Sequence, residues 1–188
     1  MKPLRGKWRY KRGRSFMDLT NEEAQALIDL PKKIMVAEQP LDEYIMRFSE
    51  HVDDQFDLIS DDGNLIFRLA IHQREQNHLK ITLHFQDNSK FIGLLRIDYN
   101  GSHKNPKILN ANVPSFAVPF ADTVIKESHA HFYVQGYKPL AWAIPLSSYD
   151  FEVKDIFDSD SSFVQAVQAF CRKINIVTHC DIEGRLFL

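Results

Sequence analysis

Residues 79–98 read LKITLHFQDNSKFIGLLRID, and this stretch decides which fold class the chain adopts. Apolar and polar residues alternate in both halves, 79–85 and 91–98, as they do in strands that bury one face. The segment 87–90 between the halves is rich in turn-forming residues. The pattern therefore predicts an antiparallel hairpin.

Two similar patterns flank this hairpin. Upstream, residues 56–59 and 65–71 enclose a strong turn signal at 61–64, where Gly63 tolerates positive φ. Downstream, we expect residues 129–134 to pair with 140–146 across another turn. The region from Leu41 to Asn100 therefore indicates an antiparallel meander.

Helices are predicted near both ends of the chain. Thr20 and Glu23 form a capping box at the start of a helix over about 21–30, which Pro31 ends. A second helix is expected over about 159–175, where apolar residues recur at helical spacing. We expect an α+β fold, a curved antiparallel β-sheet with the N- and C-terminal helices packed on one face.

Charge is distributed unevenly along the chain. Residues 1–16 carry seven basic residues and no acid, whereas residues 17–188 carry 16 basic and 25 acidic residues. We interpret 1–16 as a basic, flexible N-terminal arm and 17–188 as a single α+β domain. With its interleaved aromatic residues, the arm suits binding along a nucleic-acid backbone. A solvated tail, or an extension upstream of a start at Met17, explains the same charge block.

Several classes of protein are disfavoured by composition. No apolar run approaches the roughly 20 residues needed to cross a bilayer, and the N-terminus lacks the apolar core of a signal peptide. We expect a cytoplasmic protein with no membrane partner. Cys171 and Cys180 match no zinc or redox spacing, so two reduced thiols are expected. The sequence contains no phosphate-binding Gly-rich loop motif and no nucleophile-elbow motif.

The candidate site lies on the predicted strands between Arg96 and Leu146. Residues two apart in a strand share a face, so His129, His131 and Tyr133 are expected on one side of their strand. The same rule places Arg96 and Asp98 together. Imidazole, guanidinium and carboxylate groups on one face suit acid–base chemistry.

Two chemistries fit these histidines. With His103 from the following loop, His129 and His131 suit a metal ion that keeps one open position. Without metal, one imidazole takes the proton of a ribose 2′-hydroxyl, another protonates the leaving oxygen, and Arg96 or Lys138 steadies the charge. Asp98 orients a histidine, or forms an ion pair with Arg96 on an exposed sheet surface. The proton-transfer scheme requires RNA, because DNA lacks the 2′-hydroxyl.

We adopt the metal-independent scheme as the leading hypothesis. Catalytic roles are assigned to Asp98, His103, His129 and His131, and substrate-binding roles to Arg96, Lys104, Tyr133, Tyr137 and Lys138. We expect no metal ligand and no cofactor. The remaining histidines, among them His84, lack partners at suggestive spacing, and Trp142 is predicted to lie in the core.

The motif residues also resemble a known pattern. They are Arg96, Asp98, Gly101, His103, Asn105, Pro106, His129, His131, Phe132, Tyr133, Gly136, Tyr137, Trp142, Ala143, Pro145 and Leu146. This set resembles a family of small, largely uncharacterised proteins of bacteria and their phages. The chain is also similar in size, acidity and histidines to mobile-element factors that block host defence. These include an anti-CRISPR type that shortens the guide RNA of Cas9, and the resemblance implies RNA cleavage.

The leading hypothesis is thus a phage or mobile-element protein with a histidine-based ribonuclease site. Its expected partner is RNA, with a guide RNA–Cas9 complex as one candidate, in the cytoplasm of a host bacterium. The alternatives are a non-catalytic inhibitor that binds a protein through an acidic, nucleic-acid-like surface, a toxin–antitoxin component, and a metal-dependent hydrolase. The sequence leaves the oligomeric state open.

Overall fold

The computed structural model describes residues 19–48, 52–74, 77–156 and 160–183. The predicted basic arm, residues 1–16, lies outside these ranges. Within them, no helix is both long and apolar enough to span a lipid bilayer.

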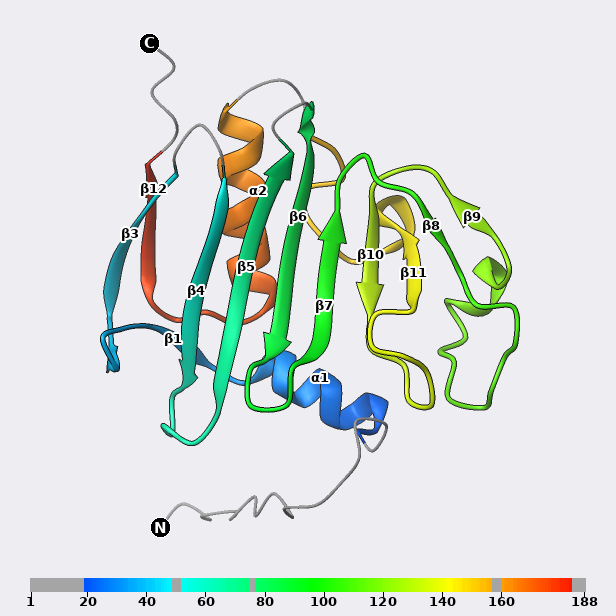
Figure 1. Cartoon of the computed structure of the whole chain (residues 1–188), viewed down its shortest axis with the longest axis horizontal. Helices are drawn as coiled ribbons and strands as arrows, with labels where there is room; N and C mark the ends of the chain where they lie inside the picture. The colour runs from blue at the N-terminus through cyan, green and yellow to red at the C-terminus, as the bar shows by residue number, and fades with distance from the viewer. Residues whose placement is uncertain (1–18, 49–51, 75–76, 157–159, 184–188) are drawn as a thin grey trace.

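An eight-stranded sheet forms the centre of the molecule, with the strand order β11-β10-β7-β6-β5-β4-β1-β2 (Figure 1). Every neighbouring pair in this order is antiparallel. The strands are β1 (Lys32–Val36), β2 (Gln39–Pro40), β4 (Asp53–Ser60), β5 (Ile66–Arg74), β6 (Asn77–Asp87), β7 (Ile92–Asp98), β10 (His129–Phe132) and β11 (Trp142–Pro145). The pairs β4–β5, β6–β7 and β10–β11 confirm the three predicted hairpins.

Two helices complete the predicted α+β fold. The helix α1 (Asn21–Asp29) begins with the expected capping box, in which Glu23 N donates to Thr20 Oγ1 at 3.1 Å and Thr20 N to Glu23 Oε2 at 2.9 Å. The helix α2 (Asp160–Lys173) lies behind the middle strands in Figure 1. Apolar residues of both helices belong to one buried cluster with the sheet, including Leu27 of α1 and Phe170 of α2. The fold-class prediction is confirmed.

Several strands had no signature in the sequence. The strand β3 (Glu43–Arg47) leaves the predicted meander and pairs in parallel with β12 (His179–Glu183) near the C-terminus. A short pair, β8 (His103–Lys104) and β9 (Val124–Ile125), lies beside β11. Each pairing joins distant segments, so no local alternation or turn predicts it.

One buried lysine connects the two helices to the sheet. The side chain of Lys32 in β1 is fully buried, and its Nζ donates to Ile28 O and Leu30 O at the end of α1 and to Ile174 O just after α2. The Nζ also lies 5.0 and 4.9 Å from the ring centroids of Phe67 and Phe85. The ammonium thus satisfies carbonyls that the helix ends leave free.

Replacing this ammonium should weaken the whole fold. We expect Lys32→Met to lower the free energy of unfolding by about 2 kcal/mol, because three buried carbonyls lose their donor. Urea unfolding followed by circular dichroism measures the change. The control is Lys33→Met, which removes an ion pair to the exposed carboxylate of Asp42 and should cost under about 1 kcal/mol. Equal losses in the two variants would contradict the role given to Lys32.

The same lysine predicts a pH dependence of stability. Burial lowers the pKa of Lys32 from 10.5 to about 7, and the charge of Asp29 opposes this shift. Between these two values the folded chain binds fewer protons at Lys32 than the unfolded chain, so stability should rise as the pH increases from about 7 toward 10. Unfolding curves at several pH values should show this rise in the wild type and a smaller one in Lys32→Met. The same dependence of stability on pH in both proteins would rule out Lys32 as its cause.

Candidate active site

The register of two strands assembles the candidate site. His129 of β10 pairs with Asp98 of β7, and His131 pairs with Arg96. Directly opposed residues in an antiparallel ladder point to the same face, so all four side chains share one side of the sheet. The residues between them, such as Ala130 and Ile97, point into the hydrophobic core. The prediction that the two histidines share a face with Arg96 and Asp98 is therefore confirmed.

His103 joins this group from the short strand β8. Its ring centroid lies 4.4 Å from that of His131 and 6.1 Å from that of His129. The ring centroids of His129 and His131 are 4.9 Å apart. Asn105 fixes the segment by donating to Ala143 O at 2.7 Å and accepting from Ala143 N at 2.8 Å. Both bonds reach β11, so the loop after β7 folds back over the sheet.

Backbone carbonyls determine the tautomer of each imidazole. His129 Nδ1 is 2.6 Å from Glu127 O, His131 Nδ1 is 2.9 Å from Leu140 O, and His103 Nε2 is 2.8 Å from Ala141 O. A carbonyl oxygen only accepts, so each of these nitrogens carries a proton. In the neutral rings the lone pair lies on the other nitrogen, which is Nε2 in His129 and His131 and Nδ1 in His103.

Asp98 and Arg96 lie between these rings. Arg96 Nε donates to Asp98 Oδ2 at 2.9 Å, and Arg96 Nη2 lies 2.8 Å from the same oxygen and 2.7 Å from His131 Nε2. Thr82 donates to Asp98 Oδ1 at 2.8 Å. Burial alone would raise the pKa of the Asp98 carboxyl, but the positive charge of Arg96 and the hydrogen bond from Thr82 hold this pKa well below its usual range. Asp98 is therefore a carboxylate at neutral pH.

His103 and His131 stay neutral at neutral pH. Burial is the main cause that lowers the pKa of His131, and it lowers the pKa of His103 as well. For both rings the positive charge of Arg96 acts in the same direction. Neutral rings keep their lone pairs, so they are available as proton acceptors or as metal ligands.

Access to the site is unequal. His129 and His131 are 1% and 0% exposed, whereas the side chains of Asp98 and Arg96 are 16% and 31% exposed and His103 is partly buried. Gly101 lies so close that an added Cβ would be 2.9 Å from His129 Cε1. A substrate can therefore approach His103 and Arg96, while His129 and His131 lie beneath the surface.

Two predicted site residues lie elsewhere. Tyr133 does not share the face of His129 and His131: it belongs to the hydrophobic core, and its hydroxyl donates to Leu19 O at 3.0 Å. The alternation fails because β10 ends at Phe132, so the strand rule no longer applies to the next residue. Tyr137 packs edge-on against Trp142 and donates to Ile108 O at 2.6 Å. Both tyrosines have structural contacts, and the prediction of their place at the site is wrong.

The two predicted lysines lie at the edge of the region. Lys104 follows His103 in β8 but forms an ion pair with Asp122 at 2.6 Å. Lys138 is exposed in the turn between β10 and β11. Neither lysine has a described contact with the histidine cluster. Trp142 is fully buried, which confirms its predicted place in the core.

One histidine was missed by the sequence analysis. His84 of β6 pairs with Arg96 of β7, which places it on the same sheet face as the candidate site. Its Nε2 is buried and has no hydrogen-bond partner among the described residues. Burial and the charge of Arg96 lower the pKa of His84 to about 4. The sequence signal that could have identified His84 is the register of the 79–98 hairpin, which places it opposite Arg96.

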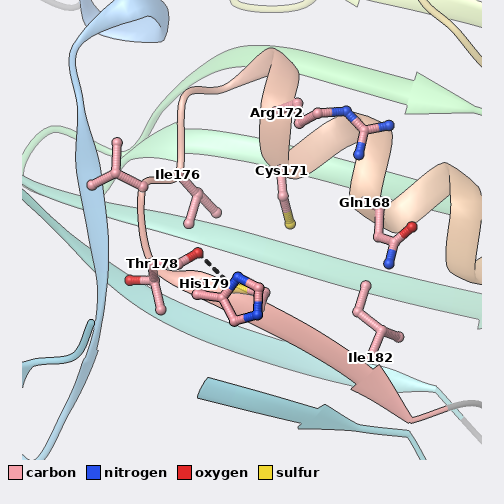
Figure 2. A pocket seen from close by; sticks show the side chains of 9 residues that line it. Gln168, Cys171, Arg172, Ile176, Thr178, His179 and Ile182 are labelled. Carbon is pink, nitrogen blue, oxygen red and sulfur yellow. Dashed lines mark hydrogen bonds between the residues drawn. The ribbon is translucent and has the colours of Figure 1, made fainter. Parts of the chain in front are cut away.

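A separate pocket between α2 and β12 has a volume of about 380 Å³ and contains none of these residues. Figure 2 shows Cys171 of α2 directed toward β12, where His179 and Thr178 line the opposite side. Burial raises the pKa of the Cys171 thiol to about 12 and that of the Cys180 thiol to about 11. Both thiols are free, as predicted. They stay protonated at neutral pH, which makes them poor nucleophiles.

The close approach of Gly101 to the site predicts a sensitive position. We expect Gly101→Ala to displace His129 and Asp98, because the new Cβ would lie 2.9 Å from His129 Cε1 and 3.3 Å from Asp98 Cβ. The histidine ring signals in NMR spectra should shift, and stability should fall by about 1–3 kcal/mol.

The matched control is Gly63→Ala, where no atom lies within 4 Å of the new Cβ but φ is +74°. That variant should lose stability through backbone strain and leave the ring signals of the site unchanged. Unchanged ring signals in Gly101→Ala would show that the loop does not constrain the site.

Comparison with known proteins gives a family without an assigned activity. The model described as a family of unknown function (DUF6978) matches residues 19–176, so the chain belongs to that family. No curated protein and no solved structure matches the chain.

Proposed function

We propose that this member of the DUF6978 family cleaves phosphodiester bonds in RNA at the cluster of Arg96, Asp98, His103, His129 and His131. The observation that carries the proposal is the grouping of the three imidazoles, each fixed by a backbone carbonyl in a tautomer that places the lone pair on its other nitrogen. Groups that accept protons near neutral pH, beside a guanidinium, are what phosphodiester cleavage requires.

The proposed reaction uses the nucleophile that RNA itself contains. The ribose 2′-oxygen attacks the adjacent phosphorus as its proton passes to a base on the protein, and the bond from phosphorus to the 5′-oxygen breaks. The departing 5′-oxygen receives a proton from an acid. The products are a 2′,3′-cyclic phosphate and a free 5′-hydroxyl, so no external oxidant or co-substrate is needed.

Exposure divides the roles among the site residues. His103 and Arg96 reach the surface, so we assign proton transfer to His103 and binding of the phosphate to Arg96. His129 and His131 are buried, so we assign them no direct contact with the substrate; they position His103 and Arg96, which reach it. His103 accounts for one of the two proton transfers. The other transfer therefore requires a further group, bound by these two buried histidines.

The substrate that we propose is a structured RNA. A CRISPR guide RNA, free or bound to Cas9, is the first candidate because the chain resembles an anti-CRISPR type in size, acidity and histidines. Such RNA lies in the cytoplasm of a host bacterium, where a phage or mobile-element protein of this kind would act.

Purified protein incubated with labelled guide RNA, free and bound to Cas9, tests the proposal. We expect discrete fragments with 2′,3′-cyclic phosphate ends, and no cleavage of the same sequence with 2′-deoxyribose. His103→Ala should lower the rate by about 100-fold or more, which is typical for loss of a proton-transfer group. His103 is only partly buried, so this variant should still fold.

The matched control is His72→Ala. His72 lies on β5 beside Asp53 at 3.4 Å and is exposed, so it reproduces a histidine–carboxylate pair of the sheet outside the site. Its variant should cleave at the wild-type rate. Intact RNA under all conditions, with divalent metal added, would refute RNA cleavage and favour a non-catalytic binding protein.

A further inference from the structure

The geometry points to a binding site for one divalent transition-metal ion, formed by Asp98, His129 and His131. This inference deepens the proposed function by naming a cofactor for the same cluster, and it departs from the expectation that no metal is involved. The three residues each offer one ligand atom, and these atoms lie within 4.8 Å of one another.

The lone pairs of the two histidines converge on one oxygen. His131 Nε2 is 3.1 Å and His129 Nε2 is 3.7 Å from Asp98 Oδ2. In both rings the carbonyl partner at Nδ1 makes Nε2 the unprotonated nitrogen of the neutral imidazole. Histidines that bind metals donate their other N–H to a carbonyl or carboxylate in this way, which fixes the ring and increases its basicity.

The nitrogen of His129 supplies an independent observation. His129 is 1% exposed, and its Nε2 has no hydrogen-bond partner in the part of the chain that the structure describes. A buried polar atom without a partner costs about 1–3 kcal/mol. This lone pair is directed toward a carboxylate, where a cation would satisfy both groups.

The contacts of Arg96 indicate that the space between His131 Nε2 and Asp98 Oδ2 favours a positive charge. Its Nη2 lies 2.7 Å from His131 Nε2 and 2.8 Å from Asp98 Oδ2, so the guanidinium holds a positive charge between two of the three ligand atoms. The side chain is 31% exposed, which allows it to turn toward solvent when a metal ion enters. Arg96 and the metal ion are therefore competitors for the same acceptors.

The ligand set indicates the class of metal. Two imidazoles and one carboxylate suit Zn²⁺, Fe²⁺ or Mn²⁺, whereas Ca²⁺ and Mg²⁺ prefer oxygen ligands alone. With metal–ligand bonds of about 2.1 Å, neighbouring ligand atoms lie about 3.0 to 3.4 Å apart. The distance from His131 Nε2 to Asp98 Oδ2 is 3.1 Å, and the distance from His129 Nε2 to that oxygen is 3.7 Å. A small rotation of the His129 ring closes the difference.

Three protein ligands leave coordination positions open for water. A metal ion lowers the pKa of bound water toward 7, which gives the second proton-transfer group that the proposed RNA cleavage requires. This link rests on the proposed function. The binding of the metal itself rests only on Asp98, His129 and His131.

Direct metal binding tests the inference without RNA. The full chain, stripped with a chelator and dialysed, is titrated with Zn²⁺ by calorimetry and with Co²⁺ by visible absorption. We expect one ion per chain and Co²⁺ bands of a nitrogen–oxygen site. His129→Gln and Asp98→Asn should each weaken binding at least about 10-fold. His72→Gln should bind as the wild type does.

Arg96→Met separates a metal site from a purely structural cluster. Removal of the competing guanidinium should tighten Zn²⁺ binding, although the same variant should lose RNA cleavage. Circular dichroism confirms that each variant folds, and Asp98→Asn decides the matter if His129→Gln does not fold. No uptake of either ion by the wild type, or equal binding by Asp98→Asn, would overturn the site. Weaker binding by Arg96→Met would overturn the competition between the guanidinium and the metal ion.

A cleavage assay in parallel distinguishes this inference from the proposed function. Zn²⁺ uptake that depends on Asp98 and His129, together with intact RNA, would support the metal site and refute RNA cleavage. Cleavage that resists chelator, in a protein that takes up no metal, would support RNA cleavage and refute the metal site.

Discussion

The fold depends on one lysine amino group buried where two helices end. Lys32 Nζ donates to the final carbonyls of α1 and to a carbonyl just after α2, and it lies over the rings of Phe67 and Phe85 of the sheet. The backbone of Lys32 also bonds to Asn175 and Val177, beyond α2. The chain leaves this junction toward β12, which pairs with β3.

The candidate site rests on a different constraint, the register between β7 and β10. A shift of one residue would move His129 and His131 to the core face and bring Ala130 beside Arg96 and Asp98. The buried alternates, Ala130 and Ile97, hold the register because they must remain in the core. The chemistry of the site is thus positioned by apolar residues that take no part in it.

Prediction from the sequence succeeded where the signal was local. The capping box at Thr20 and Glu23, the hairpin turn near Gly63 and the shared face of Arg96 and Asp98 each depend on residues close in the chain. Prediction failed for Tyr133, because the strand rule was extended one residue past the end of β10. It missed His84, whose partner Arg96 is identified by cross-strand register rather than by spacing along one strand.

The sequence by itself determined the α+β class, the hairpins and the set of histidines, since alternation and turn chemistry act over a few residues. Only the tertiary structure decided that His103 folds back onto His131, that three backbone carbonyls fix the imidazole tautomers, and that Arg96 lies between Asp98 and His131. These contacts join segments far apart in the chain. Their geometry comes from strand order and burial, which no local pattern encodes.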